Sequence, residues 1–468
     1  MSTQPAVEPY DLLVLGSGEA GKYLAWNAAS SGRKTALIER RYIGGSCPNI
    51  ACLPSKNLIY SANVAHLARQ AALYGLHPVE PGVDMQAVRA RKRAMVDGLI
   101  KTHEGRFSQT GVELILGEGR FTGPRVIEVA VHGGGTRLVS GENVVISTGS
   151  RAALDGIPGL AECGPMTHVE ALELGEVPAK LLVLGGGYVG LELAQGLRRL
   201  GSEVTIVDRN QRLLPRADED VAAEVTRAML AEGIELINGV QATKVEGRSG
   251  EHVVLHVEGD AGQRQISGTH LLVATGRIPN TQGIGLEAAG VELTAAGFVR
   301  VDEQLRSTAE GVFAVGDCAG SPHFTHIAFD DFRVVRETLA GRRRVTTGRL
   351  VPSCLFVDPE LAQIGLNETE ARRAGIPYRL LKLPMKAVLR NLTTGHTEGF
   401  LKAMLSREDD RILGFTALGA CAGEMMATVQ LAMSAGLPYT ALRDSIFAHP
   451  TYSEGLVYLF SGSPAMVG

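Results

Sequence analysis

Two segments of this sequence repeat the same unit, in which an apolar strand runs into a glycine-rich turn and then into a helix. Residues 12–21 read LLVLGSGEAG and residues 181–190 read LLVLGGGYVG, so both contain the pattern G-x-G-x-x-G. Helical patterns extend to Ala29 and Leu200, and second strands follow at 34–38 and 204–207. These strands end on acids at corresponding positions, Glu39 and Asp208. The repeat predicts two Rossmann-like α/β units.

The glycines and the acid have complementary roles in such a unit. Glycine lets the backbone approach a pyrophosphate at the helix N-terminus, and the acid accepts a hydrogen bond from a ribose hydroxyl. Two unrelated glycine-rich turns would not be followed by acids at the same distance along the chain. The sequence therefore predicts that the chain binds two dinucleotides.

Composition agrees with this fold class. A length of 468 residues corresponds to about three domains. Glycine is abundant and Trp26 is the one tryptophan, as suits a nucleotide-binding α/β protein. The net charge of −4 favours neither nucleic acid nor an anionic membrane as a partner. No apolar run reaches transmembrane length and the leader Met1–Pro9 is polar, so we expect a cytoplasmic protein.

A pair of cysteines, Cys47 and Cys52, lies just after the first unit, in the segment GGSCPNIACLPSK at 44–56. A thiolate at a helix N-terminus is stabilised by the helix dipole and by unpaired N–H groups. A metal site would need two further ligands at suitable spacing, and a structural disulfide is uncommon in a reducing cytoplasm. The pair is therefore interpreted as a redox-active disulfide.

The remaining chain divides coarsely. Helical patterns cover 56–74 and 85–110, and short alternating strands cover 112–146. A strand from Thr308 to Val315 delivers Asp317 to a loop, and from Val351 strands and helices follow without a third glycine motif. We expect two Rossmann-like dinucleotide-binding domains and a C-terminal α+β interface domain, with boundaries at 1–150, 151–276, 277–348 and 349–468.

Taken together, these motifs resemble the FAD-dependent pyridine nucleotide–disulfide oxidoreductases, the family of glutathione reductase, dihydrolipoyl dehydrogenase and mercuric reductase. The resemblance rests on the order of the first glycine motif, C-x4-C, the second glycine motif, ATGRIPNT at 274–281, Gly-Asp at 316–317 and HPTYSE at 449–454. Segments 324–331 and 435–447 are most similar to the bacterial reactive-chlorine-resistance flavoproteins. The resemblance implies that 1–150 and 277–348 bind FAD, that 151–276 binds NAD(P)H, and that 349–468 forms a homodimer.

The resemblance also implies roles for individual residues. Tyr188 would cover the nicotinamide pocket, Lys56 and Glu192 would form an ion pair beside the flavin, and Cys52 would be the flavin-proximal sulfur while Cys47 exchanges with substrate. The cofactor-binding residues that it implies are Gly16, Gly18, Gly21, Glu39, Gly45, Ser46, Lys56, Thr148, Gly149, Gly316 and Asp317 for FAD, and Gly185, Gly187, Gly190, Asp208, Gly276 and Arg277 in the second unit and its closing segment.

Thiol–disulfide exchange needs a group that takes a proton from one thiol and returns it to another, and histidine suits this role near neutral pH. His449 has Glu454 one helical turn later to orient its ring. In the family this pair reaches the disulfide of the other subunit, which implies a symmetric dimer. His323 and His326 are interpreted as packing residues, and no metal site is expected.

Some positions depart from the family pattern. Ala51 replaces a glycine, Pro48 stiffens the loop between the cysteines, and Tyr452 is bulky enough to narrow a substrate channel. Asp208 favours NADH over NADPH, although Arg209 and Arg212 could hold a 2′-phosphate.

The sequence thus predicts an NAD(P)H-dependent flavoprotein reductase that passes electrons through FAD and Cys47–Cys52 to a small disulfide, soft metal ion or reactive oxidant. Dihydrolipoyl dehydrogenase is the alternative enzyme. A flavin-bound redox sensor or complex subunit is the alternative of another class.

Overall fold

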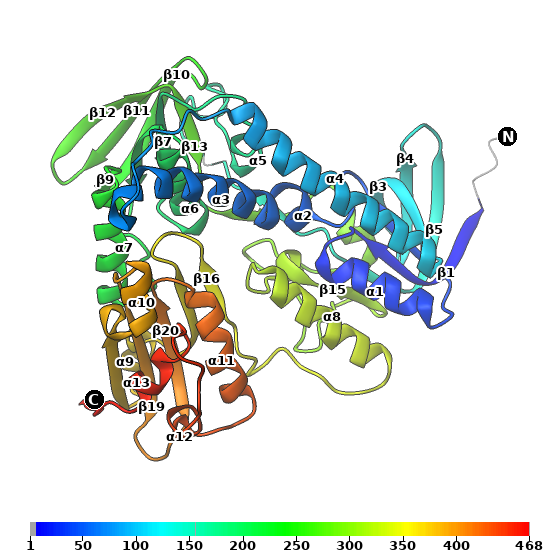
Figure 1. Cartoon of the computed structure of the whole chain (residues 1–468). Helices are drawn as coiled ribbons and strands as arrows, with labels where there is room; N and C mark the ends of the chain where they lie inside the picture. The colour runs from blue at the N-terminus through cyan, green and yellow to red at the C-terminus, as the bar shows by residue number, and fades with distance from the viewer. Residues whose placement is uncertain (1–5, 155, 468) are drawn as a thin grey trace. The chain divides into compact units, whose positions relative to one another are not determined.

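The computed structural model describes residues 6–154 and 156–467, and they form two compact units (Figure 1). Unit 1 comprises 1–58, 86–153 and 276–349, and unit 2 comprises 59–85, 154–275 and 350–468, of which we consider only the described residues. The long helix α3 (Cys52–Arg69) passes from unit 1 into unit 2. The four-part division made from the sequence stays a prediction.

Unit 1 is built on a six-stranded sheet. Strand β1 (Val7–Leu15) pairs in parallel with β2 (Thr35–Glu39) and with β5 (Thr136–Ile146), and β15 (Val312–Ala314) adds in parallel to β5. Strand β3 (Glu113–Gly123) continues in parallel from β2, while β4 (Val126–Val131) joins β3 to β5 in antiparallel pairing. The central strands are apolar and buried on both faces, as expected of a parallel sheet covered by other elements.

Helices complete unit 1. Helix α1 (Glu19–Ser30) packs against α8 (Thr325–Leu339), where the rings of Tyr23 and Phe329 meet edge to face at 4.8 Å. Helix α4 (Met85–Thr110) contributes Phe107 to the same core as α1. The short α2 (Ser46–Ile50) precedes α3, and small elements close the unit, namely β6 (Ser150–Ala152), β14 (Arg277–Pro279), η2 (Leu286–Ala289) and η3 (Gly316–Ala319).

Unit 2 contains the second nucleotide unit. Its parallel sheet has the order β13-β7-β8-β9, formed by His270–Val273, Lys180–Leu184, Glu203–Asp208 and Glu235–Asn238. In chain order, α5 (His168–Ala171) precedes β7, α6 (Tyr188–Arg199) follows β7, and α7 (Glu219–Ala231) lies between β8 and β9. An antiparallel meander is appended, consisting of β10 (Val240–Arg248), β11 (His252–Gly259) and β12 (Gly262–Gly268).

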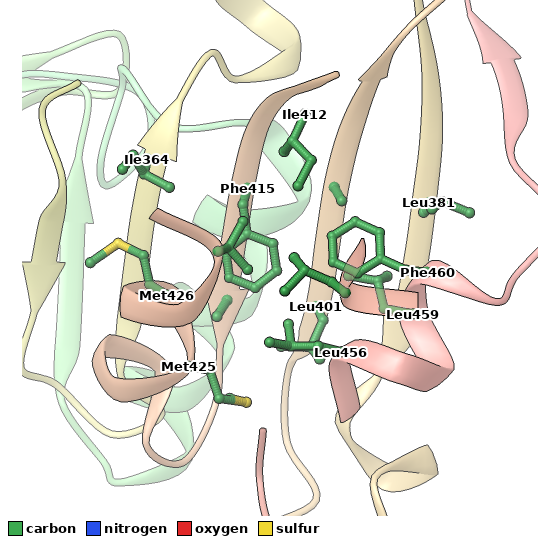
Figure 2. Packing of buried hydrophobic residues seen from close by; sticks show 14 of the residues in the cluster. Ile364, Leu381, Leu401, Ile412, Phe415, Met425, Met426, Leu456, Leu459 and Phe460 are labelled. Carbon is green, nitrogen blue, oxygen red and sulfur yellow. The ribbon is translucent and has the colours of Figure 1, made fainter. Parts of the chain in front are cut away.

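The C-terminal part of unit 2 is an antiparallel sheet with helices. Its strand order is β16-β17-β20-β19-β18-β21, formed by Ser353–Leu355, Leu361–Gly365, Ile412–Leu418, Phe400–Ser406, Tyr378–Pro384 and Ala465–Val467. The helical segments are η4 (Met385–Ala387), α9 (Glu368–Ala374), α10 (Leu389–Thr394), α11 (Ala422–Ser434), α12 (Tyr439–Arg443) and α13 (Gly455–Phe460). Figure 2 shows Phe415 and Leu401 from the sheet beside Met425 of α11 and Leu456 of α13, all of them buried.

The architecture confirms the predicted fold class. The helix expected over 56–74 begins earlier, at Cys52, and ends at Arg69, after which η1 (Ala71–Tyr74) closes on the left-handed Gly75. The strand expected from Thr308 to Val315 is shortened to Val312–Ala314, because residues 308–311 form a bend and a turn. Across the described ranges, no helix is both long and apolar enough to span a bilayer.

Candidate active site

The residues predicted to bind the first dinucleotide gather at one edge of the unit 1 sheet. Gly16 follows β1, Glu39 ends β2, Thr148 follows β5 and Asp317 follows β15. Because these four strands are parallel, their carboxyl ends meet at the same edge, which is where open α/β sheets bind ligands.

The first glycine turn is packed too tightly for side chains. Gly16 has φ +99°, and a Cβ there would lie 2.4 Å from the carbonyl oxygen of Ser147. A Cβ on Gly21 would lie 2.5 Å from the carbonyl oxygen of Gly16. Glu39 is buried, and one of its carboxylate oxygens accepts hydrogen bonds from Ser17 N–H and Oγ–H at 2.8 and 2.7 Å. The turn and its acid thus fit a dinucleotide, and their assignment to the ADP half of FAD stays a prediction.

Asp317 lies in a small polar network at the same edge. The Ser150 hydroxyl donates to Asp317, Arg277 Nε donates to Ser150 Oγ at 2.7 Å, and Arg277 Nε lies 3.6 Å from Asp317 Oδ2. Arg277 was assigned to cofactor binding from the sequence without a partner, and the structure places it beside Asp317. This network holds the carboxylate predicted to meet the ribityl chain.

The second glycine turn repeats the geometry of the first. A Cβ on Gly185 would lie 2.6 Å from the carbonyl oxygen of Ala274, and Gly186 N–H donates to Asp208 Oδ2 at 2.5 Å. Asn210 donates to Asp208 Oδ1 from both its backbone and its side chain, each at 2.7 Å. The Thr275 hydroxyl is buried and has no partner among the described residues, so a polar ligand would satisfy it. The turn therefore fits a dinucleotide.

The two arginines after Asp208 differ in their surroundings. Arg212 donates to the carbonyl oxygens of Pro215 and Ala217 at 3.3 and 3.0 Å, while Arg209 is exposed. These bonds use Arg212 Nη2, while Arg212 Nη1 is buried without a partner among the described residues, so a role for Arg212 at a 2′-phosphate stays open.

The two cysteines lie at the starts of consecutive helices. Gly45, with φ +85°, precedes α2, which contains Cys47, and Cys52 is the first residue of α3. Both sulfurs are free thiols, and Cys52 Sγ lies 3.4 Å from the Thr325 hydroxyl oxygen. A hydrogen bond with Cys52, burial and the charge of Cys52 raise the pKa of Cys47. The partner thiol and burial therefore both disfavour the thiolate form of Cys47.

Two side chains of helix α6 accept hydrogen bonds from the backbone of residues 356 and 358, which precede β17. Glu192 Oε1 accepts from Phe356 N–H at 3.0 Å, and Gln195 Oε1 accepts from Asp358 N–H at 2.8 Å. Burial raises the pKa of Tyr188, whose hydroxyl also interacts with Ser353. Glu192 and Tyr188 belong to unit 2 and Lys56 belongs to unit 1, so the predicted Lys56–Glu192 pair stays a prediction.

His449 and Glu454 interact as predicted. The Nδ1 atom of His449 lies 3.1 and 3.0 Å from the two carboxylate oxygens of Glu454, and Tyr458 donates to Oε1 at 2.9 Å. Desolvation disfavours the Glu454 carboxylate, but the hydrogen bonds from His449 and Tyr458 outweigh it and lower its pKa. The pair has the geometry of an oriented imidazole base.

Tyr452, expected to narrow a substrate channel, contacts residues of the C-terminal part of unit 2. Its hydroxyl donates to Thr394 Oγ1 at 3.2 Å and its ring packs against the core of the C-terminal sheet. The side chain is thus held within the C-terminal part of unit 2, and a substrate channel narrowed by Tyr452 stays a prediction.

Two supporting residues were missed from the sequence. Thr325 contacts Cys52 across 273 positions, and the fully buried Asp331 accepts from Gly316 N–H at 2.8 Å, which fixes the turn carrying Asp317. Both lie in segment 324–331, but neither shows a local pattern that identifies its partner. The His326 ring stacks on the Phe324 ring, and the ring centroids of His323 and Phe298 are 6.2 Å apart. Both contacts agree with packing roles for the two histidines.

Comparison with protein-family models gives two matches. Residues 10–331 match the pyridine nucleotide-disulphide oxidoreductase model, and residues 351–460 match the dimerisation domain of the same family.

Individual relatives match along almost the whole chain. A dihydrolipoyl dehydrogenase of Thermus scotoductus is 37% identical over 96% of both chains. A mercuric reductase of Bacillus cereus is 33% identical over 96% of this chain and 70% of its own. The solved Cu(II) complex of the HOCl-induced flavoprotein disulfide reductase RclA from Escherichia coli superposes with a TM-score of 0.88 at 32% identity, covering 97% of this chain and 99% of that one.

Proposed function

This chain belongs to the pyridine nucleotide-disulphide oxidoreductase family, whose members use FAD and NAD(P)H, and we propose that Cys47 and Cys52 form its redox-active disulfide. It is a flavoprotein disulfide reductase, and the acceptor that we assign to it is a small disulfide, a soft metal ion or a reactive oxidant. The observation that carries the assignment is the thiol pair itself, at two consecutive helix starts.

The two thiols have different surroundings, which supports different roles. Cys52 contacts the Thr325 hydroxyl, whereas a hydrogen bond with Cys52 and burial raise the pKa of Cys47. The first glycine turn and Glu39 would hold FAD, whose chemistry when bound is to carry two electrons from the nicotinamide to the disulfide. Cys47 would then exchange with the acceptor while Cys52 is held in place, since exchange requires one accessible nucleophile and one resolving thiol.

The proton of the exchanging thiol needs an acceptor, and His449 is proposed for it. Its ring side chain is 60% exposed while Glu454 is 14% exposed, so the carboxylate fixes Nδ1 and the remaining nitrogen is available to a thiol. A carboxylate in this position also stabilises the imidazolium that forms.

A homodimer is proposed to complete the site, with His449 acting on the disulfide of the other subunit. Tyr60, Val64 and Leu67 on one face of α3 are between 49% and 64% exposed. Ile446, three residues before His449, is fully exposed. Exposed apolar side chains of this kind mark protein interaction surfaces, and the match to a dimerisation domain supports a second copy as the partner.

The acceptor class is inferred from the dithiol and from the relatives. Soft cations prefer thiolate ligands, so the reduced pair could hold such an ion and transfer electrons to it. The similarity to RclA, described as HOCl-induced and solved with Cu(II), and to mercuric reductases supports compact acceptors.

Dihydrolipoyl dehydrogenase is the second candidate, and the 37% identity to the Thermus scotoductus enzyme favours it. A redox sensor or complex subunit would not need the proton-transferring pair His449–Glu454, so this function is the least supported of the three candidates.

The test is steady-state NADH oxidation with a panel of acceptors: glutathione disulfide, a small aromatic disulfide, Hg(II), Cu(II), hypochlorous acid and lipoamide. Cys47→Ser and Cys52→Ser are the matched variants. We expect turnover with a compact acceptor that both substitutions abolish. Preferential turnover of lipoamide, or of dihydrolipoamide with NAD⁺, would instead assign the second candidate. No acceptor-dependent turnover in FAD-loaded protein would favour the sensor.

A further inference from the structure

A buried lysine lies behind the turn that carries Cys47. Lys22 is 4% exposed, and its ammonium nitrogen lies 2.7 Å from Glu19 Oε2, 3.3 Å from the Gly44 carbonyl oxygen and 3.2 Å from His103 Nε2. An ammonium group has three protons and no lone pair, so these three acceptors satisfy it completely. His103 Nε2 must therefore accept, which makes His103 neutral in this arrangement.

His103 also packs against the turn. Its ring stacks on Trp26 with centroids 5.8 Å apart and planes 12° apart. On the other side, a Cβ added to Gly44 would lie 2.7 Å from His103 Nδ1, so only glycine fits between this ring and the chain. Gly44 has φ +92°, a conformation that also favours glycine.

The turn is fixed from three directions. Gly44 N–H donates to Ser17 Oγ at 2.9 Å, Lys22 binds the Gly44 carbonyl, and the Asn49 side chain donates to the Gly45 carbonyl at 2.7 Å. Gly45 precedes α2, and Cys47 is two residues further on. The position of the Cys47 sulfur thus depends on where Lys22 holds the turn.

Lys22 also controls a charge. A hydrogen bond with Cys52 and burial are the main causes that raise the pKa of Cys47, and the Glu19 carboxylate adds to them. Since Lys22 is paired with Glu19, its positive charge offsets that effect. The titratable or hydroxyl groups that face Cys47 are Cys52 from α3, Glu19 from α1 and Thr325 from α8. Those around Lys22 are Glu19 and His103, with the ring of Tyr23 5.8 Å away.

We propose that Lys22, held between Glu19 and His103, is a positioning residue that fixes the Gly44–Gly45 turn and, through its pair with Glu19, the reactivity of the Cys47 sulfur. This inference rests on the proposed function, because it concerns Cys47 as the exchanging thiol.

The test measures Cys47 directly in the reduced, FAD-loaded protein. Iodoacetamide alkylates a thiolate: the sulfur forms a bond to carbon and iodide leaves. The rate at the Cys47 peptide, followed by mass spectrometry from pH 5 to 10, gives the pH midpoint of that thiol. Lys22→Met leaves Glu19 unpaired and should raise the midpoint by about 0.5 to 1 pH unit, a roughly three- to tenfold slower reaction below it.

Two further variants separate charge from structure. Glu19→Gln should lower the midpoint, and the double variant Glu19→Gln/Lys22→Met should return it toward the wild-type value. Lys244→Met, which removes the lysine of an exposed Lys244–Glu246 pair in unit 2, is the control and should change nothing. If Lys22→Met does not retain FAD, the midpoint of Glu19→Gln alone tests the proposal: a lowered midpoint supports it and an unchanged midpoint contradicts it.

A midpoint unchanged in both single variants would overturn the proposal, as would a double variant that matches Lys22→Met. These outcomes do not depend on any acceptor. Failure of the proposed function would appear differently, as acceptor turnover that persists after Cys47 has been alkylated.

Discussion

His449 Nδ1 lies 3.0 Å from Glu454 Oε2, although the exposure of the two side chains differs strongly. The carboxylate is largely covered and receives a further hydrogen bond from Tyr458, whereas the imidazole is mostly exposed. This contrast fits a base whose orientation is set from within its own chain and whose free nitrogen faces another molecule. It is the arrangement that proton transfer to a partner's thiol would require.

Removal of the base should slow turnover without removing FAD. We expect His449→Gln to lower kcat by about 10² to 10³, the usual contribution of a general acid–base group. Glu454→Gln should have a smaller effect, about tenfold, because the ring loses orientation but stays present. Stopped-flow reduction by NADH checks the assignment: the reductive half-reaction should be normal in both variants. Slow flavin reduction would contradict the role proposed for His449.

The nicotinamide cofactor should be NADH. Asp208 is buried and held by Gly186 and Asn210, so its carboxylate would meet the adenosine ribose and repel a 2′-phosphate. We expect kcat/KM for NADH to exceed that for NADPH by about tenfold or more, and Asp208→Asn to narrow the gap. Equal values for the two cofactors in the wild-type protein would be inconsistent with this assignment.

The exposed face of α3 should be buried in a dimer. A charge at Val64, which is 55% exposed, would be placed in an apolar interface, so Val64→Asp should shift the protein toward monomer and lower activity. Leu230→Asp is the matched control, since Leu230 is 53% exposed on α7 and lies outside the proposed surface. Light scattering measures the oligomeric state of each variant, and a parallel assay measures its activity. A fully active Val64→Asp monomer would show that the site is complete within one chain.

Unit 1 should be sensitive to acid through His103. Burial and the neighbouring Lys22 charge lower the pKa of His103 from 6.5 to about 4. Below pH 6.5 the unfolded chain takes up a proton at this ring, while the folded chain does not do so until about pH 4. Stability from this group is therefore present above pH 6.5 and is lost as the pH falls toward 4.

His103→Gln removes that titration, so its melting temperature should fall less between pH 7 and pH 5 than that of the wild type. The comparison concerns the change with pH within each protein, because the substitution can also alter stability uniformly. Parallel melting curves for the two proteins across this range would contradict the assigned cause.

Much of the fold follows from local patterns. The two glycine units were predictable because the strand, turn, helix and acid all lie within about 30 residues, which is the length of one βαβ unit. Helix α4 was predicted with the bounds that the structure shows, Met85–Thr110. The Cys47–Cys52 and His449–Glu454 pairs were visible because their members are close in sequence.

The contacts that the sequence did not reveal join distant segments. Thr325 reaches Cys52 across 273 positions, and Arg277 reaches Asp317 only because β14 pairs with β6. The contact between Tyr452 and Thr394, which lies 58 residues earlier, was likewise not visible in the sequence. Side-chain direction in such cases is decided by tertiary packing, which periodicity and spacing do not encode.

The most direct test of the central claim is an anaerobic reductive titration of the FAD-loaded protein with dithionite. An enzyme with a redox-active disulfide takes up one pair of electrons at FAD and a second pair at the disulfide. We predict two pairs per subunit for the wild type and one pair for Cys47→Ser and Cys52→Ser, each with FAD retained. Uptake of a single pair by the wild-type protein would contradict the claim that Cys47 and Cys52 carry the electrons.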